Sequence, residues 1–138
     1  MEAIIVDTGP LVAYLDRREE HHEWVLATLR ELTEPLLTCD AVLIEAAHVL
    51  NRKGQPTDLV FSLMTEGLIK PCFEITKHWR ELATLMRTYR AVPMSVTDAC
   101  LVRMSEVQRS SVVFTLDRDF LIYRRNGRQR IPLLAPFV

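Results

Sequence analysis

The chain has 138 residues, 49% of them hydrophobic, and its 17 basic and 18 acidic side chains leave a formal net charge of -1. A chain of this length and apolar content can bury one real core, so we expect a single domain over residues 1–138. A charge so close to zero excludes a molecule that attracts nucleic acid through an overall positive field, and any nucleic-acid surface must be local.

Cysteine usage and the first residues predict a soluble, cytoplasmic protein. The three cysteines are odd in number, widely spaced and free of any C-x-x-C pattern, which argues against a disulfide framework and a zinc knuckle. No charged start followed by a long apolar segment precedes Asp7, and no apolar run is long enough to cross a membrane. We therefore expect no membrane contact.

Strands and helices alternate along the chain. Residues 3–6 form a continuously apolar run, as expected of a strand buried on both faces of a parallel sheet, and a Gly-Pro turn then leads into a helix. Helical spacing follows at residues 21–32, 40–52 and 57–66, with weaker strands at 35–38 and 69–73. Helices at 77–89 and 97–108 then precede a second continuously apolar strand at 112–114 and a last strand at 131–134.

This order predicts a three-layer α/β/α fold with a central, mainly parallel sheet of four to five strands. Residues 3–6 and 112–114 are expected to be the two central strands. Prolines within 69–73 and 131–134 place those two strands at the edges of the sheet.

Acidic residues follow both central strands. Asp7 comes directly after residues 3–6, and Asp117 closes the strand at 112–114, with Asp119 two positions later. Ligands of open parallel sheets bind outside the carboxyl ends of the strands, although each acid could instead cap the following helix or turn. If the strands are neighbours, the carboxylates repel by roughly 4 kcal/mol at about 4 Å with an effective dielectric near 20, and a cation would relieve this repulsion.

Two further acids lie on predicted helices. Glu45 interrupts an apolar face, where an unpartnered carboxylate is costly, unless it is a rim residue whose head reaches solvent. His48, one turn later, is interpreted as an ordinary helix-face residue. Asp98 follows Ser95 in a Ser-x-x-Asp pattern that could equally be a capping box. Together with Asp7 and Asp117 these acids predict a site for hard divalent cations.

The segments around these acids resemble the four motifs of the PIN domain family, and most closely those of the small VapC-type toxins of prokaryotic toxin–antitoxin modules. The four segments are IVDTGPLVAYLD, LLTCDAVLIEAAHVL, VPMSVTDACLV and VVFTLDRDF. The resemblance covers nearly the whole chain and makes Asp7, Glu45, Asp98 and Asp117 the catalytic and metal-binding residues. Asp119 is then an accessory ligand, and Thr8, Ser95 and Thr115 are candidates to orient carboxylates or water.

The resemblance implies a metal-dependent endoribonuclease. The four acids would hold one or two Mg²⁺ or Mn²⁺ ions, which would activate a water for in-line attack on phosphorus and stabilise the leaving 3′ oxygen. The chain has no Gly-rich phosphate loop, no recognisable nucleophile elbow and no paired His residues that would support another mechanism.

Local basic residues are the expected RNA contacts. Arg124, Arg125, Arg128 and Arg130 form the densest group after the fourth motif, and Arg17 and Arg18 follow the first helix. Such side chains would hold flanking phosphates with little sequence information. An ordinary solvated charge run is an equally good interpretation.

Three alternatives remain open. The first is a PIN nuclease of RNA processing that is not a toxin. The second is a receiver-like phosphoacceptor domain, which would need an acid pair after its first strand and a Lys on a late strand, where this chain has Asp7 alone and Asp117. The third is a PIN domain that serves only as an interaction module, which would be expected to have lost acids.

The expected partners are RNA, a second copy of the chain and a small VapB-type antitoxin. Residues 59–64 are apolar nearly all round, which suggests a helix packed between protomers, and the family resemblance also implies a homodimer. The antitoxin would place an Arg or Lys among the four acids and lay an amphipathic helix in a groove between residues 13–32 and 40–52.

Overall fold

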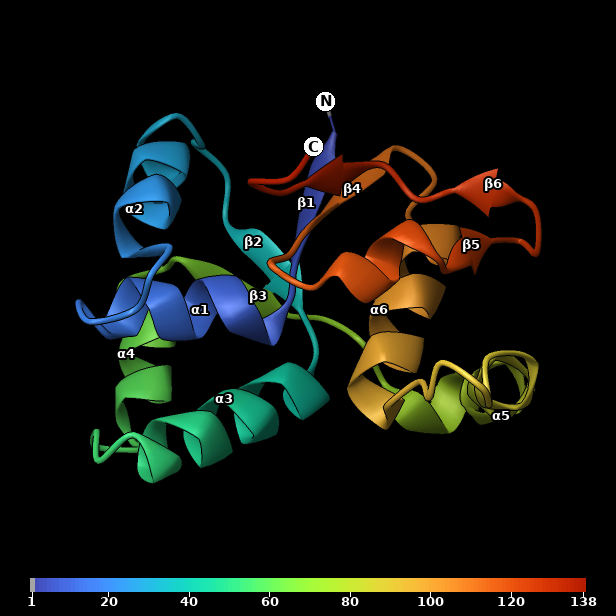
Figure 1. Cartoon of the computed structure of the whole chain (residues 1–138), viewed down its shortest axis with the longest axis horizontal. Helices are drawn as coiled ribbons and strands as arrows, with labels where there is room; N and C mark the ends of the chain where they lie inside the picture. Colours follow the sequence, from blue (N-terminus) through green and yellow to red (C-terminus); the bar gives the residue numbers. More distant parts are fainter. Residues whose placement is uncertain (1) are drawn as a thin grey trace.

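Five parallel strands form the central sheet of the computed structural model, which describes residues 2–138 (Figure 1). The strands lie in the order β3-β2-β1-β4-β7, so β1 is central, and every neighbouring pair is parallel. The bounds are β1 (Ala3–Val6), β2 (Leu36–Thr38), β3 (Ile69–Pro71), β4 (Ser111–Phe114) and β7 (Leu133–Leu134).

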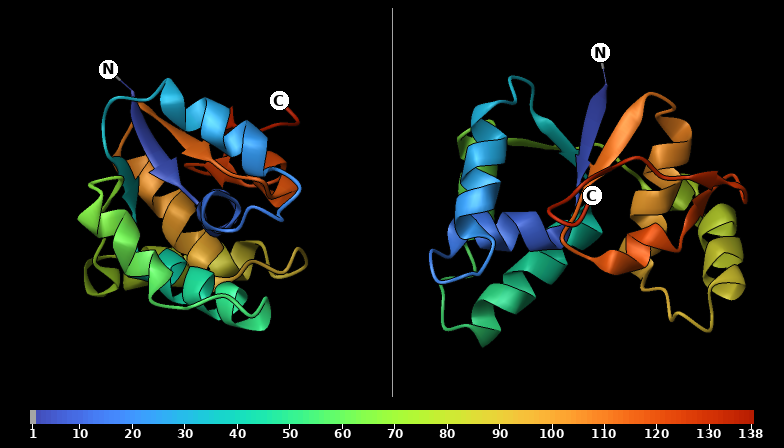
Figure 2. Two further views of the ribbon diagram at one scale, coloured as in Figure 1. Left: turned by 90° about the vertical axis from the view of Figure 1, so that its left-hand side faces the viewer. Right: turned by 45° about the horizontal axis from the view of Figure 1, so that its top comes forward.

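Helices cover both faces of this sheet, and Figure 2 shows the strands between α2 on one side and α6 on the other. The helices are α1 (Thr8–Leu15), α2 (His22–Arg30), α3 (Asp40–Arg52), α4 (Leu59–Thr65), α5 (Trp79–Thr88) and α6 (Val96–Val107), with short 3₁₀ turns η1 (Ile75–Lys77) and η2 (Arg118–Leu121). Two short antiparallel strands, β5 (Arg124–Arg125) and β6 (Gln129–Arg130), form a hairpin outside the sheet.

The main core lies between the central strands and the helices that cover them. The fully buried residues include Ile5 of β1, Phe114 of β4 and Leu101 of α6. Four successive residues of α6, 99–102, are all 0% exposed, because this helix packs against β1 and β4 and also against α3 and α5. A polar residue that projects from α6 toward the carboxyl edge of the sheet is therefore held on a rigid support.

The α/β class, the parallel sheet and the edge positions of β3 and β7 confirm the predictions made from the apolar pattern. The β5–β6 hairpin was not predicted. Its turn places both Asn126 and Gly127 at positive φ, 53° and 76°, which is the Asn-Gly signal for a hairpin. The Asn-Gly pair was not recognised as a hairpin turn, because the residues on both sides of it are charged or polar and show no apolar alternation.

No helix within residues 2–138 combines the length and the apolar character needed to cross a lipid bilayer.

Candidate functional site

Asp7 and Asp117 leave neighbouring strands at the same edge of the sheet. Val6 is paired with Phe114 in the parallel β1–β4 ladder, and the Asp7 amide donates to the Phe114 carbonyl at 2.9 Å. Gly9 then packs closely on the loop after β4, since a Cβ at this position would lie 3.2 Å from Leu116 Cβ. The small residue therefore allows the start of α1 to approach the segment that carries Asp117.

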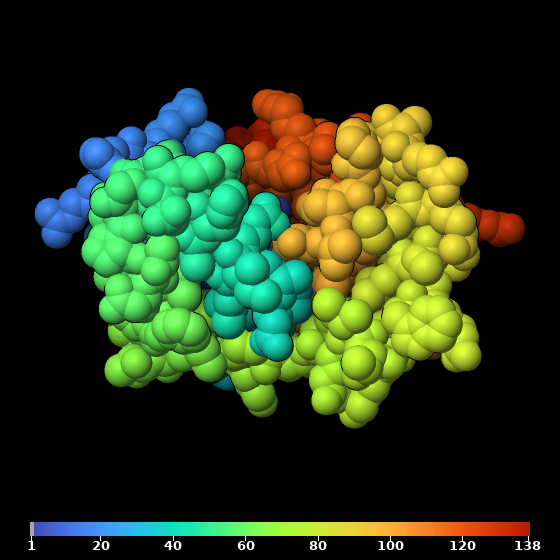
Figure 3. Space-filling model, turned by 90° about the horizontal axis from the view of Figure 1, so that it is seen from below, coloured from blue at the N-terminus to red at the C-terminus, as the bar shows by residue number. Residues whose placement is uncertain are grey.

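A cleft of about 560 Å³ opens at this edge and is lined by all four predicted catalytic acids, Asp7, Glu45, Asp98 and Asp117. They come from four separate segments: the end of β1, α3, the first turn of α6 and the loop after β4. Figure 3 shows the surface hollowed between α3, α6 and the segment that follows β4, with N-terminal atoms visible at its floor. The fold thus brings together residues up to 110 positions apart.

Asp7 is the most deeply placed of these acids. It is 6% exposed, its Oδ1 accepts a hydrogen bond from the Thr8 amide at 2.7 Å, and its Oδ2 accepts one from Thr115 Oγ1, also at 2.7 Å. Burial raises the pKa of Asp7 to about 7, against the effect of these hydrogen bonds, and the charges of Asp98 and Glu45 add to the rise. A nearby positive charge would stabilise its ionised form.

Asp98 is both a helix cap and a cleft residue. Ser95 and Asp98 form a capping box at the start of α6, as the Ser-x-x-Asp pattern predicted. Its Oδ2 accepts hydrogen bonds from the Ser95 amide at 3.4 Å and from Tyr123 Oη at 2.8 Å. Burial raises the pKa of Asp98 while these hydrogen bonds lower it. Both donors engage Oδ2, which leaves Oδ1 available to a ligand.

Asp117 is positioned by the backbone of its own loop. Its amide donates to Thr115 Oγ1 at 2.9 Å, and its Oδ1 accepts from the Asp119 amide at 2.9 Å. Thr115 therefore bonds both to Asp7 and to the segment that carries Asp117, and its role in orienting a carboxylate for a ligand stays a prediction. Asp119 supports Asp117 through its amide and is not among the residues that line the cleft.

Glu45 lines the cleft from an exposed position on α3. The prediction that it interrupts a buried apolar face is wrong, because the buried residues of α3 are Val42, Ala46 and Leu50. It is the rim residue of the alternative interpretation, and its head reaches both solvent and the cleft. His48 is exposed on the same helix, as interpreted above.

Three residues near the site were not identified from the sequence: Glu19, Arg118 and Tyr123. Glu19 lines the cleft and pairs with Lys53 at 3.1 Å, and Arg118 lines it beside Asp117. Tyr123 donates to Asp98 from a fully buried position. Arg118 lies inside the fourth motif and could have been selected as its only basic residue, whereas no local pattern connects the other two to the cleft.

The arginines selected as RNA contacts fall into two groups: those whose guanidinium is bound within the chain, and those that are exposed. Arg125 is 7% exposed and its guanidinium donates to the Arg109 carbonyl and to the carbonyl and Oγ of Ser111, so its place is structural. Arg124 donates to three carbonyls at the end of η2, and Arg18 pairs with Asp16 at 3.2 Å. The remaining members, Arg17, Arg128 and Arg130, are exposed, and none of the six lines the cleft.

The donor set of the cleft fits a hard divalent cation in its chemistry. Carboxylate oxygens are the preferred protein ligands of Mg²⁺ and Mn²⁺. Burial, with a smaller contribution from the charges of Asp98 and Glu45, raises the pKa of Asp7, and a bound cation would favour its ionised form. Thr8 Oγ1 is buried in the cleft wall with no hydrogen-bond partner. Within residues 2–138, however, no three acidic, His or Cys side chains converge closely enough to form a finished ligand set.

Residues 4–126 match the family model described as PIN domain. No curated protein matches the chain. The matched residues include all four acids of the cleft, residues 4–6 of β1 and the whole of β2, β3 and β4.

Proposed function

The chain belongs to the PIN domain family, which has a nuclease-type fold, and from that premise we propose that it is a Mg²⁺- or Mn²⁺-dependent endoribonuclease that hydrolyses RNA phosphodiester bonds. The observation that carries the proposal is the meeting of Asp7, Glu45, Asp98 and Asp117 in one cleft from four separate segments. A receiver-like domain needs a Lys on a late strand, and Arg118 is the only basic residue among those that line the cleft.

The four carboxylates would hold the cation, which when bound supplies positive charge to the phosphate and lowers the pKa of a water molecule. The chain itself contributes orientation. Thr115 fixes one oxygen of Asp7, and Tyr123 with the Ser95 amide fixes one oxygen of Asp98. Glu45, on the exposed rim, is free to approach a ligand in the cleft. These contacts restrict the carboxylate rotamers before any ligand arrives.

The direct test is cleavage of a labelled RNA by the purified protein in Mg²⁺ or Mn²⁺, with EDTA as the metal-free condition. We expect cleavage in the presence of either metal and none in EDTA. Glu45→Gln should be inactive, while the matched control Glu31→Gln, an exposed residue at the end of α2, should cleave like the unmodified protein. Equal activity in EDTA would contradict the proposal.

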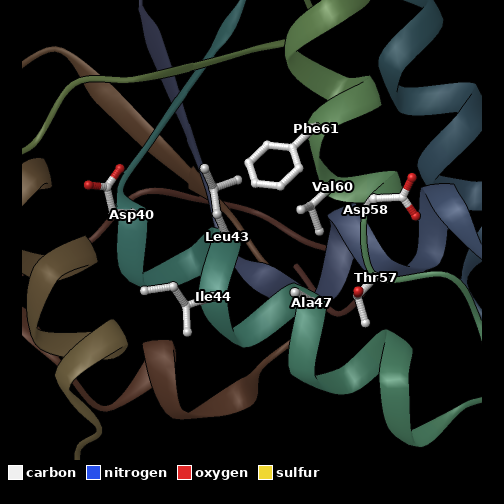
Figure 4. A pocket seen from close by; sticks show the side chains of 8 residues that line it. All are labelled: Asp40, Leu43, Ile44, Ala47, Thr57, Asp58, Val60 and Phe61. Atoms are coloured by element: carbon white, nitrogen blue, oxygen red, sulfur yellow. The ribbon is translucent and has the colours of Figure 1, made fainter.

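Within this function we propose that the protein is the toxin of a VapBC-type module rather than a nuclease of general RNA processing. We also propose that it forms a homodimer. Support for the dimer comes from the exposed apolar side chains of α3 and α4: Ile44 is 71% exposed, Phe61 61% and Met64 44%. Ile44 and Phe61 line a groove of about 430 Å³ between the two helices (Figure 4). Burial of such side chains against a second copy is favourable.

Sedimentation tests the dimer. The protein should sediment as a dimer at micromolar concentration. Phe61→Ser should shift it toward a monomer that is still folded by circular dichroism, because Phe61 is exposed within one chain. A monomeric unmodified protein would contradict this part of the proposal.

The proposed antitoxin would compete with the cation by placing an Arg or Lys among the acids of the cleft. Its amphipathic helix would lie in the groove expected between residues 13–32 and α3, beside the point where Val12 of α1 packs on Ala46 and Leu50. The test mixes the protein with the protein encoded by a neighbouring reading frame and measures RNA cleavage. Because cation and inhibitor compete, cleavage by this mixture should increase as Mg²⁺ is added. Inhibition that persists after every Arg and Lys in the tail of that partner is replaced by Ala would contradict the mechanism.

A further inference from the structure

Arg118 is the only basic residue among those that line the acidic cleft. It follows Asp117 directly, begins η2 and is exposed to solvent. Within the part of the chain that the structure describes, Arg118 forms no ion pair, although carboxylates line the same cleft. Its guanidinium is therefore not paired with the acids beside it.

The guanidinium of Arg118 lies over the ring of Phe137. The Arg118 Cζ atom is 4.8 Å from the centroid of the Phe137 ring, a distance at which the cation and the ring attract. β7 runs parallel to β4 with Leu134 opposite Phe114, and the Thr115 amide donates to the Leu134 carbonyl at 3.1 Å. The segment after β7 thus emerges at the same sheet edge as Asp117.

A guanidinium held over a ring keeps its N–H groups available at its edge. These donors match the oxygens of a phosphate in a bidentate arrangement. By contrast, Arg18 forms an ion pair with Asp16, and Arg103 forms one with Glu106 at 3.2 Å. Arg118 combines a place in the cleft, solvent access and unused donors.

We propose that Arg118 binds an RNA phosphate adjacent to the bond that is cleaved, and that Phe137 is the positioning residue that holds its guanidinium. This inference rests on the proposed nuclease function and names a substrate contact for it. A crowded carboxylate cleft repels the RNA backbone, so a fixed positive group at its rim attracts the strand and sets its register relative to the acids.

The test is the binding of a fluorescently labelled single-stranded RNA in EDTA, followed by anisotropy over a titration of NaCl. Arg118→Ala should weaken binding about tenfold at low salt. It should also make the negative slope of log K against log [salt] shallower by about 0.7, the value for one phosphate contact on a single strand. Arg30→Ala is the matched control, because Arg30 is exposed at the end of α2, away from the cleft.

Phe137 is tested by a double-mutant cycle. Phe137→Ala should weaken RNA binding by a smaller factor than Arg118→Ala, Phe137→Tyr should restore it, and Phe137→Ala should have no further effect when Arg118 is already Ala. In Mn²⁺, Arg118→Ala should raise KM and leave kcat nearly unchanged, which a general loss of structure would not do.

The outcomes separate this inference from the nuclease proposal. Binding by Arg118→Ala that matches Arg30→Ala overturns the inference even if the protein cleaves RNA. If the unmodified protein cleaves no RNA in Mg²⁺ or Mn²⁺, the nuclease proposal is contradicted. If Arg118→Ala nevertheless weakens RNA binding, the phosphate contact is supported. An equal loss from Phe137→Ala with and without Arg118 overturns the positioning role, and an unmodified protein that binds no RNA overturns the whole inference.

Discussion

The acidic cleft and the arginine-rich β5–β6 hairpin are two charged regions of the chain, and their charged side chains make different contacts. In the hairpin, Arg125 is buried and donates to backbone and Ser111 oxygens. In the cleft, Asp98 and Asp117 each accept the hydrogen bonds given above on a single carboxylate oxygen. The free carboxylate oxygens of Asp98 and Asp117 are available to a ligand, whereas the guanidinium of Arg125 is bound mainly to oxygens of the fold.

The largest effect expected from this comparison is on catalysis. Asp7→Asn, Glu45→Gln, Asp98→Asn and Asp117→Asn should each lower Mg²⁺- or Mn²⁺-dependent RNA cleavage by more than about a hundredfold, because each removes a charged ligand from the proposed site. Each variant should still fold, as judged by circular dichroism. Full activity in any two of the four would contradict a shared site.

In the hairpin, the same kind of change should act on stability. Arg125→Ala removes three donor contacts and leaves the Arg109 and Ser111 oxygens without them, which should lower the free energy of unfolding by about 2–3 kcal/mol. The exposed neighbour Arg128 is the control, and Arg128→Ala should change it by less than about 0.5 kcal/mol. Urea unfolding measures both. Equal stability of the two variants would remove the structural role of Arg125.

The difference between these regions also explains what the sequence could predict. Asp7 and Asp117 were predictable because each follows an apolar strand that can only be central. The arginines of the hairpin were not, because the partners of Arg125 lie 14 and 16 positions away in the chain. The exposure of Glu45 was missed because alanines surround it, and Ala41, Ala46 and Ala47 do not define which face of α3 is buried until α1 packs against it.

The buried Asp7 should make the metal-free protein sensitive to pH. Its pKa is raised from 3.8 to about 7, so between these values the folded state holds a proton that the unfolded state has lost. Stability from this group is present at low pH and is lost as pH rises through about 7, by at most about 1.4 kcal/mol per pH unit. Thermal unfolding in EDTA from pH 5 to 8 measures the slope.

Asp7→Asn is the variant that isolates this effect. It keeps the shape of the side chain and cannot ionise, so its melting temperature in EDTA should fall less between pH 5 and 8 than that of the unmodified protein. A slope that is the same in both proteins would show that Asp7 is ionised across this range. In that case the buried carboxylate of Asp7 would be ionised without the cost in folding free energy that its burial predicts.

The smallest effect is expected where the core meets the cleft, at the hydrogen bond from Tyr123 to Asp98. Burial and the neighbouring Asp98 raise the pKa of Tyr123 above its usual range, so this phenol stays protonated and can only donate to the carboxylate. Tyr123→Phe keeps the ring, which packs edge-on against Tyr89 and Phe120, and removes one hydrogen bond to a charged acceptor.

We therefore expect Tyr123→Phe to lower the free energy of unfolding by about 1 kcal/mol and to weaken Mn²⁺ binding by about tenfold, because Asp98 would lose the contact that fixes its Oδ2. Calorimetric titration with Mn²⁺ measures the binding directly. Tyr89→Phe is the control, since Tyr89 Oη accepts from the Arg124 amide and does not contact Asp98. Equal Mn²⁺ affinity in the two variants would mean that Tyr123 supports the core and has no part in orienting the acid.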